Sequence, residues 1–421
     1  MSIVMSITGI VVLLFIGALL SDNRKAINLR TVCGALAIQV SLGAFVLYVP
    51  FGRDVLYSIS SSVTQVVAYS HDGINFLFGG LTSNKMYEVF GGGGFVFALK
   101  VLPIIIFFSA LIAVLYHIGI MQLIINLLGG LLQKVLGTSR AESLAATANI
   151  FVGQTEAPLV VRPFIAKMTQ SELFAVMCGG MASVAGSILV GYAALGVKME
   201  YLIAASFMAA PGGLLFAKLI KPEIEVPINE CSNIDSNESS DNDEPVNVID
   251  AAATGASSGM QLAMLVGAML LAFIGMIALI NGIIGGLGGL VGWPELSLEL
   301  ILGYLFSPLA FLIGVPWSEA SIAGSFIGQK LIVNEFVAYL NFAPYLQEGA
   351  EIALSHKTEA IISFALCGFA NFSSIAILLG GLGGLAPNRR HEIASLGMKA
   401  VAAATLSNLM SATIAGLFIT L

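Results

Sequence analysis

The sequence predicts an all-α polytopic membrane protein. Of its 421 residues, 57% are hydrophobic and only 10% are charged, a composition that soluble globular proteins do not have. Its apolar runs are about 20 residues long, the length of a helix that crosses a bilayer. They do not alternate with polar residues as barrel strands do, so a barrel is excluded. No basic tract with interleaved aromatic residues is present, and nucleic acid is not an expected partner.

The first 120 residues contain three predicted spans and an interfacial region. Ile3–Leu20 is a retained membrane helix rather than a signal peptide, because no basic segment precedes it and no cleavage site follows it. The basic loop 21–30 is expected in the cytoplasm, which places the N-terminus outside, and Thr31–Pro50 spans back. Arg53–Asn84 is too polar to span and too apolar for a free loop, so interfacial helices are expected along the outer surface. Phe95–Ile120 is the third span.

A re-entrant hairpin is predicted over Asn126–Met168. Basic residues at both of its ends place both ends in the cytoplasm. The apolar sequence between them is interrupted by GQTEAP, Gly153–Pro158, and irregular backbone at membrane depth is tolerated only where protein or a wet cavity surrounds it. Leu173–Leu195 then spans, with small residues at its centre, CGGMASVAGS, that suit close helix packing or a break in the helix. Glu200–Lys218 returns to the cytoplasm.

A hydrophilic segment, Lys221–Asp250, separates the two halves of the chain. It is rich in Asn, Ser, Asp and Glu and contains three prolines, so a flexible cytoplasmic linker is expected. Met260–Ile280 spans outward after it. The glycine-rich run that follows, up to Trp293, is expected to make a turn with an aromatic residue at the membrane surface.

The second half repeats the pattern of the first half in the opposite orientation. Ser297–Tyr345 holds two short apolar pieces and the stretch GQKLIVNEFVAY, Gly328–Tyr339, and its acidic flanks place both ends outside. Thr358–Leu382 spans, with its centre interrupted by CGFANFSS, and Val401–Leu421 spans to an outside C-terminus. A hairpin followed by a broken helix thus occurs twice, which is typical of an inverted-topology repeat.

Glu335 is the strongest functional candidate in the sequence. A carboxylate at bilayer depth costs roughly 2.5–3.5 kcal/mol on insertion scales, so such a residue marks a functional site by default. The alternative is that Glu335 lies in water at a hairpin tip or pairs with Lys330.

The two interruptions and the two broken helices are expected to meet near the middle of the membrane and to form a substrate site. Their polar side chains are Gln154, Thr155, Glu156, Asn334, Glu335, Asn371, Ser373 and Ser374. These groups suit a neutral solute that carries hydroxyl or amide groups, and no Lys or Arg is forced to the centre. Oxygen ligands beside Asn149 and Ser183 suit Na⁺, whereas Zn²⁺ would require His or Cys clusters that the sequence lacks.

Three stretches, GQKLIVNEFVAY, GQTEAP and GFANFSS, resemble signature stretches of the concentrative nucleoside transporters, and the order of hairpins and broken helices matches that family over nearly the whole chain. The resemblance implies a bacterial sodium-coupled nucleoside symporter. It implies eight transmembrane helices, two opposed re-entrant hairpins, interfacial helices and inverted repeats, assembled as a homotrimer. It also implies elevator-type alternating access, in which a transport part moves against a scaffold part and carries nucleosides such as uridine into the cell.

The resemblance also assigns residues to ligands. The residues that would face the nucleobase are Gln154, Thr155 and Glu156. The residues that would bind the ribose hydroxyls are Glu335, Asn371 and Ser374, with Phe369 packing nearby. The ligands of Na⁺ would be the side chains of Asn149 and Ser183 and the backbone carbonyls of Val152 and Val184.

Five parts are expected along the chain. Residues 1–120 form a scaffold part that contains the N-terminal spans and interfacial helices, and residues 251–294 add a scaffold helix. Residues 121–220 and 295–421 are the two transport repeats, joined by the linker 221–250. The protein is expected in the bacterial inner membrane with both termini outside, and its partners would be nucleoside, membrane lipid and further copies of itself.

Two alternatives stay open at this point. H⁺ could replace Na⁺ as the coupling ion, with Glu156 or Glu335 as the proton site. A membrane-embedded hydrolase could use the same two carboxylates as acid and base. It would need a nucleophile or a metal, and no HExxH or GxSxG motif is present. The sequence therefore favours a transporter over an enzyme.

Overall fold

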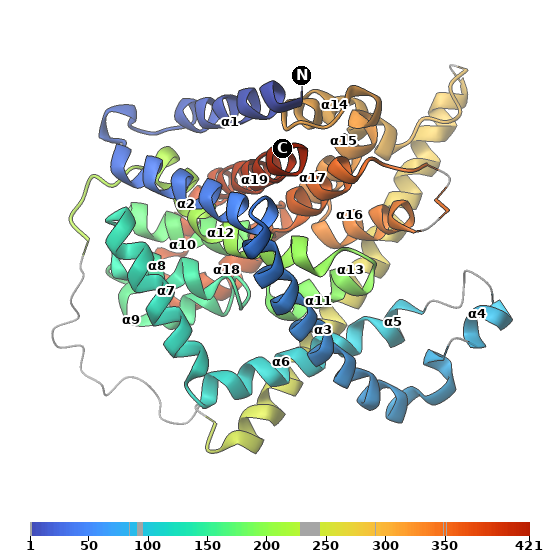
Figure 1. The fold of residues 1–421 in the computed structure, drawn as a ribbon, viewed down its shortest axis with the longest axis horizontal. Coiled ribbons are helices and arrows are strands. Elements are labelled where there is room, and N and C mark those ends of the chain that lie inside the picture. Colours follow the sequence, from blue (N-terminus) through green and yellow to red (C-terminus); the bar gives the residue numbers. More distant parts are fainter. Residues whose placement is uncertain are drawn as a thin grey trace.

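The computed structural model describes residues 2–83, 85–90, 96–227, 245–290, 292–347, 349–350 and 352–421, and every regular element among them is a helix (Figure 1). Six helical stretches in these ranges are long and apolar enough to cross a bilayer, judged by length and composition. The prediction of a helical membrane protein is therefore confirmed.

Helices α1 (Ser2–Leu19) and α2 (Leu29–Leu47) lie against α12 (Met199–Ile220) and α19 (Arg390–Thr420). A Cβ atom added at Gly9 of α1 would lie 3.2 Å from Cγ2 of Thr413. At the other end of α1, Asp22 forms ion pairs with Lys399 and Lys221. Helices α1 and α19 are therefore antiparallel, and the two chain termini lie at the same end of the molecule (Figure 1).

The region expected as interfacial helices is mainly one long helix, α3 (Pro50–Phe78), followed by η2 (Gly79–Thr82) and α4 (Lys85–Phe90). The turn between α2 and α3 is so tight that a Cβ at Gly52 would lie 1.9 Å from the carbonyl oxygen of Phe45. Only glycine fits there without a backbone shift. Helices α5 (Phe97–Lys100) and α6 (Leu102–His117) form the next apolar stretch.

Helix α13 (Val248–Leu290) has 43 residues, so it is about 65 Å long at 1.5 Å per residue. The expected span Met260–Ile280 lies inside this helix, but the expected glycine-rich turn begins later than predicted, because the helix continues through most of that run to Leu290. In apolar surroundings no water is available to bond the backbone N–H and C=O groups, and a helix pairs these groups along its own length. This gain outweighs the low helix propensity of glycine. In Figure 1, α13 runs from the bottom of the view to its upper right.

Helix α13 pairs with α6 through small residues. A Cβ at Gly255 would lie 2.5 Å from Cβ of Ala113, and one at Gly259 would lie 2.8 Å from Cα of Ile106. Such close approach is typical of helix pairs in membranes. Most of the expected linker, residues 228–244, lies outside the described residues.

The two halves of the chain share one order of elements. The first half contains α7 (Ile120–Leu136), α8 (Arg140–Ala148), η4 (Ala157–Val161), α9 (Arg162–Ile165), α10 (Gln170–Ala182), α11 (Gly186–Ala194) and α12. The second half contains α14 (Leu298–Leu312), α15 (Trp317–Ile332), α16 (Glu335–Phe342), η5 (Ala343–Leu346), α17 (His356–Leu366), α18 (Ser373–Leu385), η6 (Pro387–Arg389) and α19. The pairs α10–α11 and α17–α18 are the two expected broken helices.

The stretch expected as the second hairpin, Ser297–Tyr345, contains two reversals of the chain. Helix α14 packs along α15 after a bend of 115°, and a further turn lies at Val333–Asn334, between α15 and α16. The first half has a matching arrangement, since α7 precedes and contacts α8.

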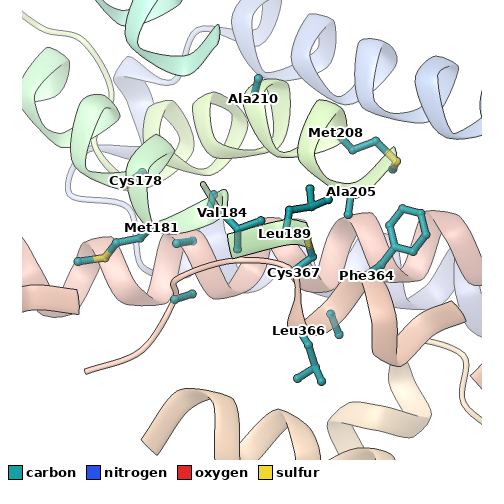
Figure 2. Close-up of a cluster of buried hydrophobic side chains, with 14 of the residues drawn as sticks. Cys178, Met181, Val184, Leu189, Ala205, Met208, Ala210, Phe364, Leu366 and Cys367 are labelled. Carbon is teal, nitrogen blue, oxygen red and sulfur yellow. The ribbon is translucent and has the colours of Figure 1, made fainter. Parts of the chain in front are cut away.

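The core of the molecule lies around α10, α12 and α19. The most apolar window of α12 is 94% buried, as is that of the α10–α11 stretch, whereas the corresponding window of α13 is only 11% buried. Figure 2 shows a cluster of these buried side chains, including Leu189 of α11, Ala205 of α12 and Cys367 at the end of α17. Helix α12 is therefore central, and α13 presents most of its surface outward.

Basic residues gather at the end of the molecule that holds the base of the first hairpin. Arg30 donates to the carbonyl of Lys134 at 3.0 Å, and Arg389 donates to the carbonyls of Ile165 and Met168 at 3.0 and 2.6 Å. The residues that the sequence assigned to the cytoplasm thus lie together.

Candidate functional site

The breaks of the two broken helices meet in the core. The backbone N–H of Phe369, in the second break, donates to the carbonyl of Ser183, in the first break, at 3.2 Å. The side chain of Asn408 on α19 spans both breaks, because its Nδ2 donates to the carbonyl of Ala182 at 2.6 Å and to that of Cys367 at 3.0 Å. Backbone groups freed by the interruptions therefore find partners inside the protein, as apolar surroundings require.

Each hairpin is bonded to the break of the helix that follows it. The N–H of Gly186, at the start of α11, donates to the carbonyl of Phe151 in the first hairpin at 3.0 Å. The N–H of Phe372, just before α18, donates to the carbonyl of Leu331 in the second hairpin at 3.3 Å. The two halves thus place equivalent contacts on either side of the site.

Glu335 is held as a buried carboxylate at the start of α16. Asn334 caps this helix by accepting from the N–H of Val337 at 2.8 Å, and the positive end of the helix dipole favours an anion at this position. Glu335 is only 5% exposed. Its Oε1 accepts from the hydroxyl of Tyr192 at 3.0 Å, and its Oε2 accepts from Nδ2 of Asn371 at 2.9 Å.

Hydrogen bonds continue from Glu335 to the tip of the first hairpin. Oδ1 of Asn371 accepts from the N–H of Ser374 at 2.9 Å and from the hydroxyl of Ser373 at 2.7 Å. The hydroxyl of Ser374 accepts from Nε2 of Gln154 at 3.3 Å. Oε1 of Gln154 is buried without a hydrogen-bond partner among the described residues, so one acceptor is free for a ligand.

A cavity of about 190 Å³ lies over this network. Its lining includes all seven residues expected to bind substrate, namely Gln154, Thr155, Glu156, Glu335, Phe369, Asn371 and Ser374. Apolar side chains of α13, among them Leu262 and Val266, form one wall. Two larger hollows, of about 790 and 740 Å³, are lined by other residues. The described structure therefore brings the expected substrate residues to one small cavity that has polar groups opposite an apolar wall.

Thr155 and Glu156 are the most accessible of the seven. Oε2 of Glu156 accepts from the N–H of Gly153 at 3.2 Å, which closes the turn at the tip of the first hairpin. Gly381 of α18 lets this tip approach, since a Cβ there would lie 2.9 Å from Cγ2 of Thr155.

Lys330 does not pair with Glu335. The residue is 3% exposed, and its ammonium group donates to the carbonyl of Ala365 at 2.7 Å and to Oδ1 of Asn408 at 2.6 Å. No ion pair within 4.0 Å joins it to any carboxylate in the described ranges. The alternatives that Glu335 lies in water or pairs with Lys330 are therefore wrong, and the buried lysine lies outside the cavity lining.

The four residues expected to hold Na⁺ lie at the tip of the first hairpin and in the first break. Asn149 caps α8 and is 1% exposed, with its Nδ2 donating to the carbonyl of Ala145 at 2.9 Å. Its Oδ1 is buried without a hydrogen-bond partner in the described part of the chain. The hydroxyl of Ser183 donates to the carbonyl of Gly179 at 3.0 Å, and Val152 and Val184 are buried. An unpaired buried oxygen in a set of oxygen donors fits a hard cation.

Clusters of the kind that bind Zn²⁺ are absent from the residues that the structure describes, where no group of three or more His, Cys, Asp or Glu side chains converges. The donor set at Asn149 and Ser183 consists of amide, hydroxyl and carbonyl oxygens, which do not suit a soft metal.

Sequence reasoning missed two buried residues that organise this site. Tyr192 on α11 binds Glu335, and Asn408 on α19 binds both breaks. Both lie in long apolar helices without a local motif. The one indication in the sequence was that each places a polar side chain within an apolar segment at bilayer depth. The apolar wall from α13 was also missed, because its distance in sequence from either hairpin gives no indication of contact.

This fold and site define a helical membrane transporter. Models of the "Na+ dependent nucleoside transporter" N-terminus and C-terminus match residues 8–81 and 201–416, and a "Nucleoside recognition" model matches residues 98–199. The chain belongs to the concentrative nucleoside transporter family.

Similar proteins cover the whole chain. It is 62% identical over 420 residues to an uncharacterized transporter of Haemophilus influenzae, a match that covers 100% of this chain and 98% of the relative. It is 56% identical over 414 residues to the nucleoside permease NupC of Helicobacter pylori, which covers 98% of this chain and 97% of the relative. A solved structure of CNTnw in an inward-facing substrate-bound state is 64% identical, with a TM-score of 0.96 and coverage of 100% of this chain and 98% of the other.

Family membership decides two of the expectations. The relatives are permeases and transporters, so the protein is a transporter and not an enzyme, and the hydrolase alternative is excluded. The family models are named for Na⁺ dependence, which confirms Na⁺ as the coupling ion at the level of the family.

Proposed function

We propose that this protein is a Na⁺-coupled symporter that carries nucleosides such as uridine into the cell. The observation that carries the proposal is the single cavity in which Gln154, Glu335, Asn371 and Ser374 converge from both halves of the chain. The named substrate of NupC from Helicobacter pylori and the substrate-bound state of CNTnw support it.

The chemistry of the cavity suits a neutral solute with a polar sugar and a flat base. Glu335 would accept hydrogen bonds from ribose hydroxyls, and Asn371 and Ser374 would complete that side. A charge-assisted hydrogen bond is about twice as strong as a neutral one. Gln154, Thr155 and Glu156 would face the nucleobase, with Phe369 against the ligand.

Na⁺ would bind at Asn149, Val152, Ser183 and Val184, as cargo that moves with the nucleoside. The bond from Phe369 to Ser183 joins the residue beside the ligand to a residue of this ion site. Binding of either solute would therefore favour the break geometry that the other requires. One Na⁺ falling through about 100 mV releases roughly 2.3 kcal/mol, enough to concentrate a neutral solute some 40-fold at about 1.4 kcal/mol per decade.

The proposed cycle is of the elevator type. The transport part comprises residues 121–220 and 295–421, and the scaffold part is built on α6 and α13, within residues 1–120 and 251–294. Helices α1 and α2 pack on α12 and α19, so we assign them to the moving part although residues 1–120 were expected as scaffold. Structures of CNTnw in inward-facing and outward-facing states, with TM-scores of 0.96 and 0.98 to this chain, support alternating access.

The proposed membrane arrangement has eight spans, formed by α1, α2, α5–α6, α10–α11, α12, α13, α17–α18 and α19. The two hairpins, α8–η4 and α15–α16, would enter from opposite faces. The basic end of the molecule would face the cytoplasm of the bacterial inner membrane, which places both termini outside. The exposed apolar face of α13 would meet lipid and further protomers of a homotrimer.

H⁺ coupling is the remaining alternative, with Glu156 or Glu335 as the proton site. The carboxylates of both residues line the cavity, so a proton site is available there. The unpaired Oδ1 of Asn149 instead favours Na⁺, a cation that binds oxygen ligands.

Uptake of labelled uridine into proteoliposomes tests the proposal, with inward gradients of Na⁺, K⁺ or H⁺ compared. Accumulation with Na⁺ alone is the expected result. Accumulation with H⁺ alone would keep the substrate and overturn the ion site. The absence of uptake by folded protein under every gradient would overturn the substrate.

A further inference from the structure

The ammonium group of Lys330 lies at the end of a helix that stops inside the molecule. Its acceptors are the carbonyl of Ala365, in the last turn of α17, and Oδ1 of Asn408. A buried ammonium requires compensation for the water it has lost. Its hydrogen-bond partners are neutral oxygens, and the negative end of a helix dipole and the more distant carboxylate of Glu335 add to the compensation.

Lys218 provides a contrast within the same protein. It is also buried, at 5% exposure, but it forms ion pairs with Glu142 and, at 3.2 Å, with Glu223. The arrangement around Lys218 is an ordinary buried salt bridge. Lys330 instead has the surroundings of a cation that is coordinated by oxygen dipoles.

The repeat relates the position of Lys330 to the proposed Na⁺ site. In the first half, the hairpin contacts the following break through Phe151 and Gly186, and two of the four proposed Na⁺ ligands, Ser183 and Val184, lie at the end of α10. In the second half, the hairpin contacts the following break through Leu331 and Phe372, and the ammonium of Lys330 lies at the end of α17. Each break thus has a site for one positive charge beside the carboxyl end of its first half-helix.

We propose that Lys330 is a tethered cation that fills, in the second repeat, the place that Na⁺ takes in the first. This inference rests on the proposed function. The protein therefore needs a mobile cation at one break only, and one Na⁺ accompanies each nucleoside. Lys330 touches neither solute and acts as a positioning residue.

Asn408 connects the tethered cation to both breaks. Its Oδ1 accepts from Lys330, while its Nδ2 donates to the carbonyl of Ala182 at the end of α10 and to that of Cys367 at the end of α17. Gly368 leaves the space for this contact, since a Cβ there would lie 2.3 Å from Oδ1 of Asn408. The fixed charge at the second break therefore also orders the half-helix end that contributes to the Na⁺ site.

The test compares Lys330→Met, which removes the charge at similar length, with Lys330→Arg, which keeps it. Uridine binding and the Hill coefficient for Na⁺ are measured on purified protein in nanodiscs. Wild type is expected to show a Hill coefficient of about one. Lys330→Met is expected to bind uridine at least about tenfold more weakly. High Na⁺ should restore this binding with a Hill coefficient clearly above one, because a second ion replaces the ammonium. Lys330→Arg should keep the wild-type coefficient.

Lys218→Met is the matched control, because it also removes a buried lysine. It should lower the thermal unfolding temperature and leave the Hill coefficient for Na⁺ unchanged. If Lys330→Met binds uridine as wild type does, or loses affinity without a change in the Hill coefficient, the tethered cation is refuted. If Lys330→Met does not fold, the Hill coefficient for Na⁺ of Lys330→Arg is the deciding measurement. A value above that of wild type in Lys330→Arg would overturn the inference. Uridine binding by wild type that ignores Na⁺ would instead overturn the proposed function.

Discussion

The hydroxyl of Tyr192 donates a hydrogen bond of 3.0 Å to Oε1 of Glu335, and the ring of Tyr192 stacks on Tyr339 with 4.3 Å between centroids. The carboxylate is thus oriented by α11, an element of the other repeat. This contact joins the two halves of the chain at the edge of the cavity, and it makes the position of Glu335 depend on the broken helix of the first half.

Replacing Tyr192 with Phe keeps the stacked ring and removes only the donor to Glu335. Uridine binding should weaken by about tenfold, because a buried charged acceptor loses a partner at roughly 1–3 kcal/mol. The measurement is a uridine titration at saturating Na⁺. Tyr339→Phe is the matched control: its hydroxyl donates to the carbonyl of Ser363 at 2.6 Å, and the residue does not line the cavity. Equal losses in the two variants would contradict a specific role for Tyr192.

Replacing Glu335 with Gln should abolish uridine uptake. Two charge-assisted hydrogen bonds at roughly 1.5–3 kcal/mol each correspond to about 100-fold or more at 1.4 kcal/mol per decade. Uptake into proteoliposomes measures the loss, and thermal unfolding establishes that the variant is folded. Uptake at the wild-type rate would rule out ribose recognition by this carboxylate.

Replacing Asn149 with Ala removes the unpaired oxygen at the proposed ion site. The Na⁺ concentration for half-maximal uptake should rise about ten- to 100-fold, since a ligand to a charged group contributes roughly 1.5–3 kcal/mol. Asn281→Ala is the control, because Asn281 on α13 bonds Glu299 at 2.9 Å and is not among the proposed Na⁺ ligands. An unchanged Na⁺ titration in Asn149→Ala would argue against the site.

Two glycine substitutions should act in opposite directions. Gly368→Ala places a methyl group 2.3 Å from Oδ1 of Asn408 and 2.7 Å from the carbonyl of Ala182, so overpacking should cost about 1–3 kcal/mol or more. Gly380→Ala lies in α18 with nothing within 4 Å of the added Cβ, and it should stabilise the helix by up to about 1 kcal/mol. Thermal unfolding in detergent measures both, and a neutral Gly368→Ala would show that the breaks are loosely packed.

Acid should weaken the contacts at the basic end of the molecule. Partial burial alone would raise the pKa of Asp22, but hydrogen bonds from Lys399 and Lys221 outweigh it and lower the pKa below its ordinary value of 3.8. A lowered pKa stabilises the fold fully above the unfolded value, and this stabilisation disappears as the pH falls through the folded value. The unfolding temperature of wild type should therefore fall more between pH 7 and about pH 3 than that of Asp22→Asn. The same drop in both proteins would show that these ion pairs contribute nothing.

Much of the fold was predictable because the bilayer imposes a length on apolar helices and a charge bias on their loops. Both broken helices and both hairpin tips were located from polar interruptions, and the cavity joins the seven residues expected to bind substrate. The length of α13 was not predictable, because a glycine-rich run is typical of a turn in a soluble protein. In apolar surroundings the same run can continue a helix. The roles of Tyr192 and Asn408 depend on contacts over 143 and 226 residues of sequence, which no local pattern encodes.

The antiparallel packing of α1 on α19 has a practical meaning for distance measurements. In the proposed elevator cycle, dyes attached at the two chain ends of one protomer would both lie on the transport part, so their separation should stay constant. Such a pair would provide a reference distance within the same protomer. Under the same proposal, movement of the transport part across the membrane would be measured between either chain end and a dye on α13.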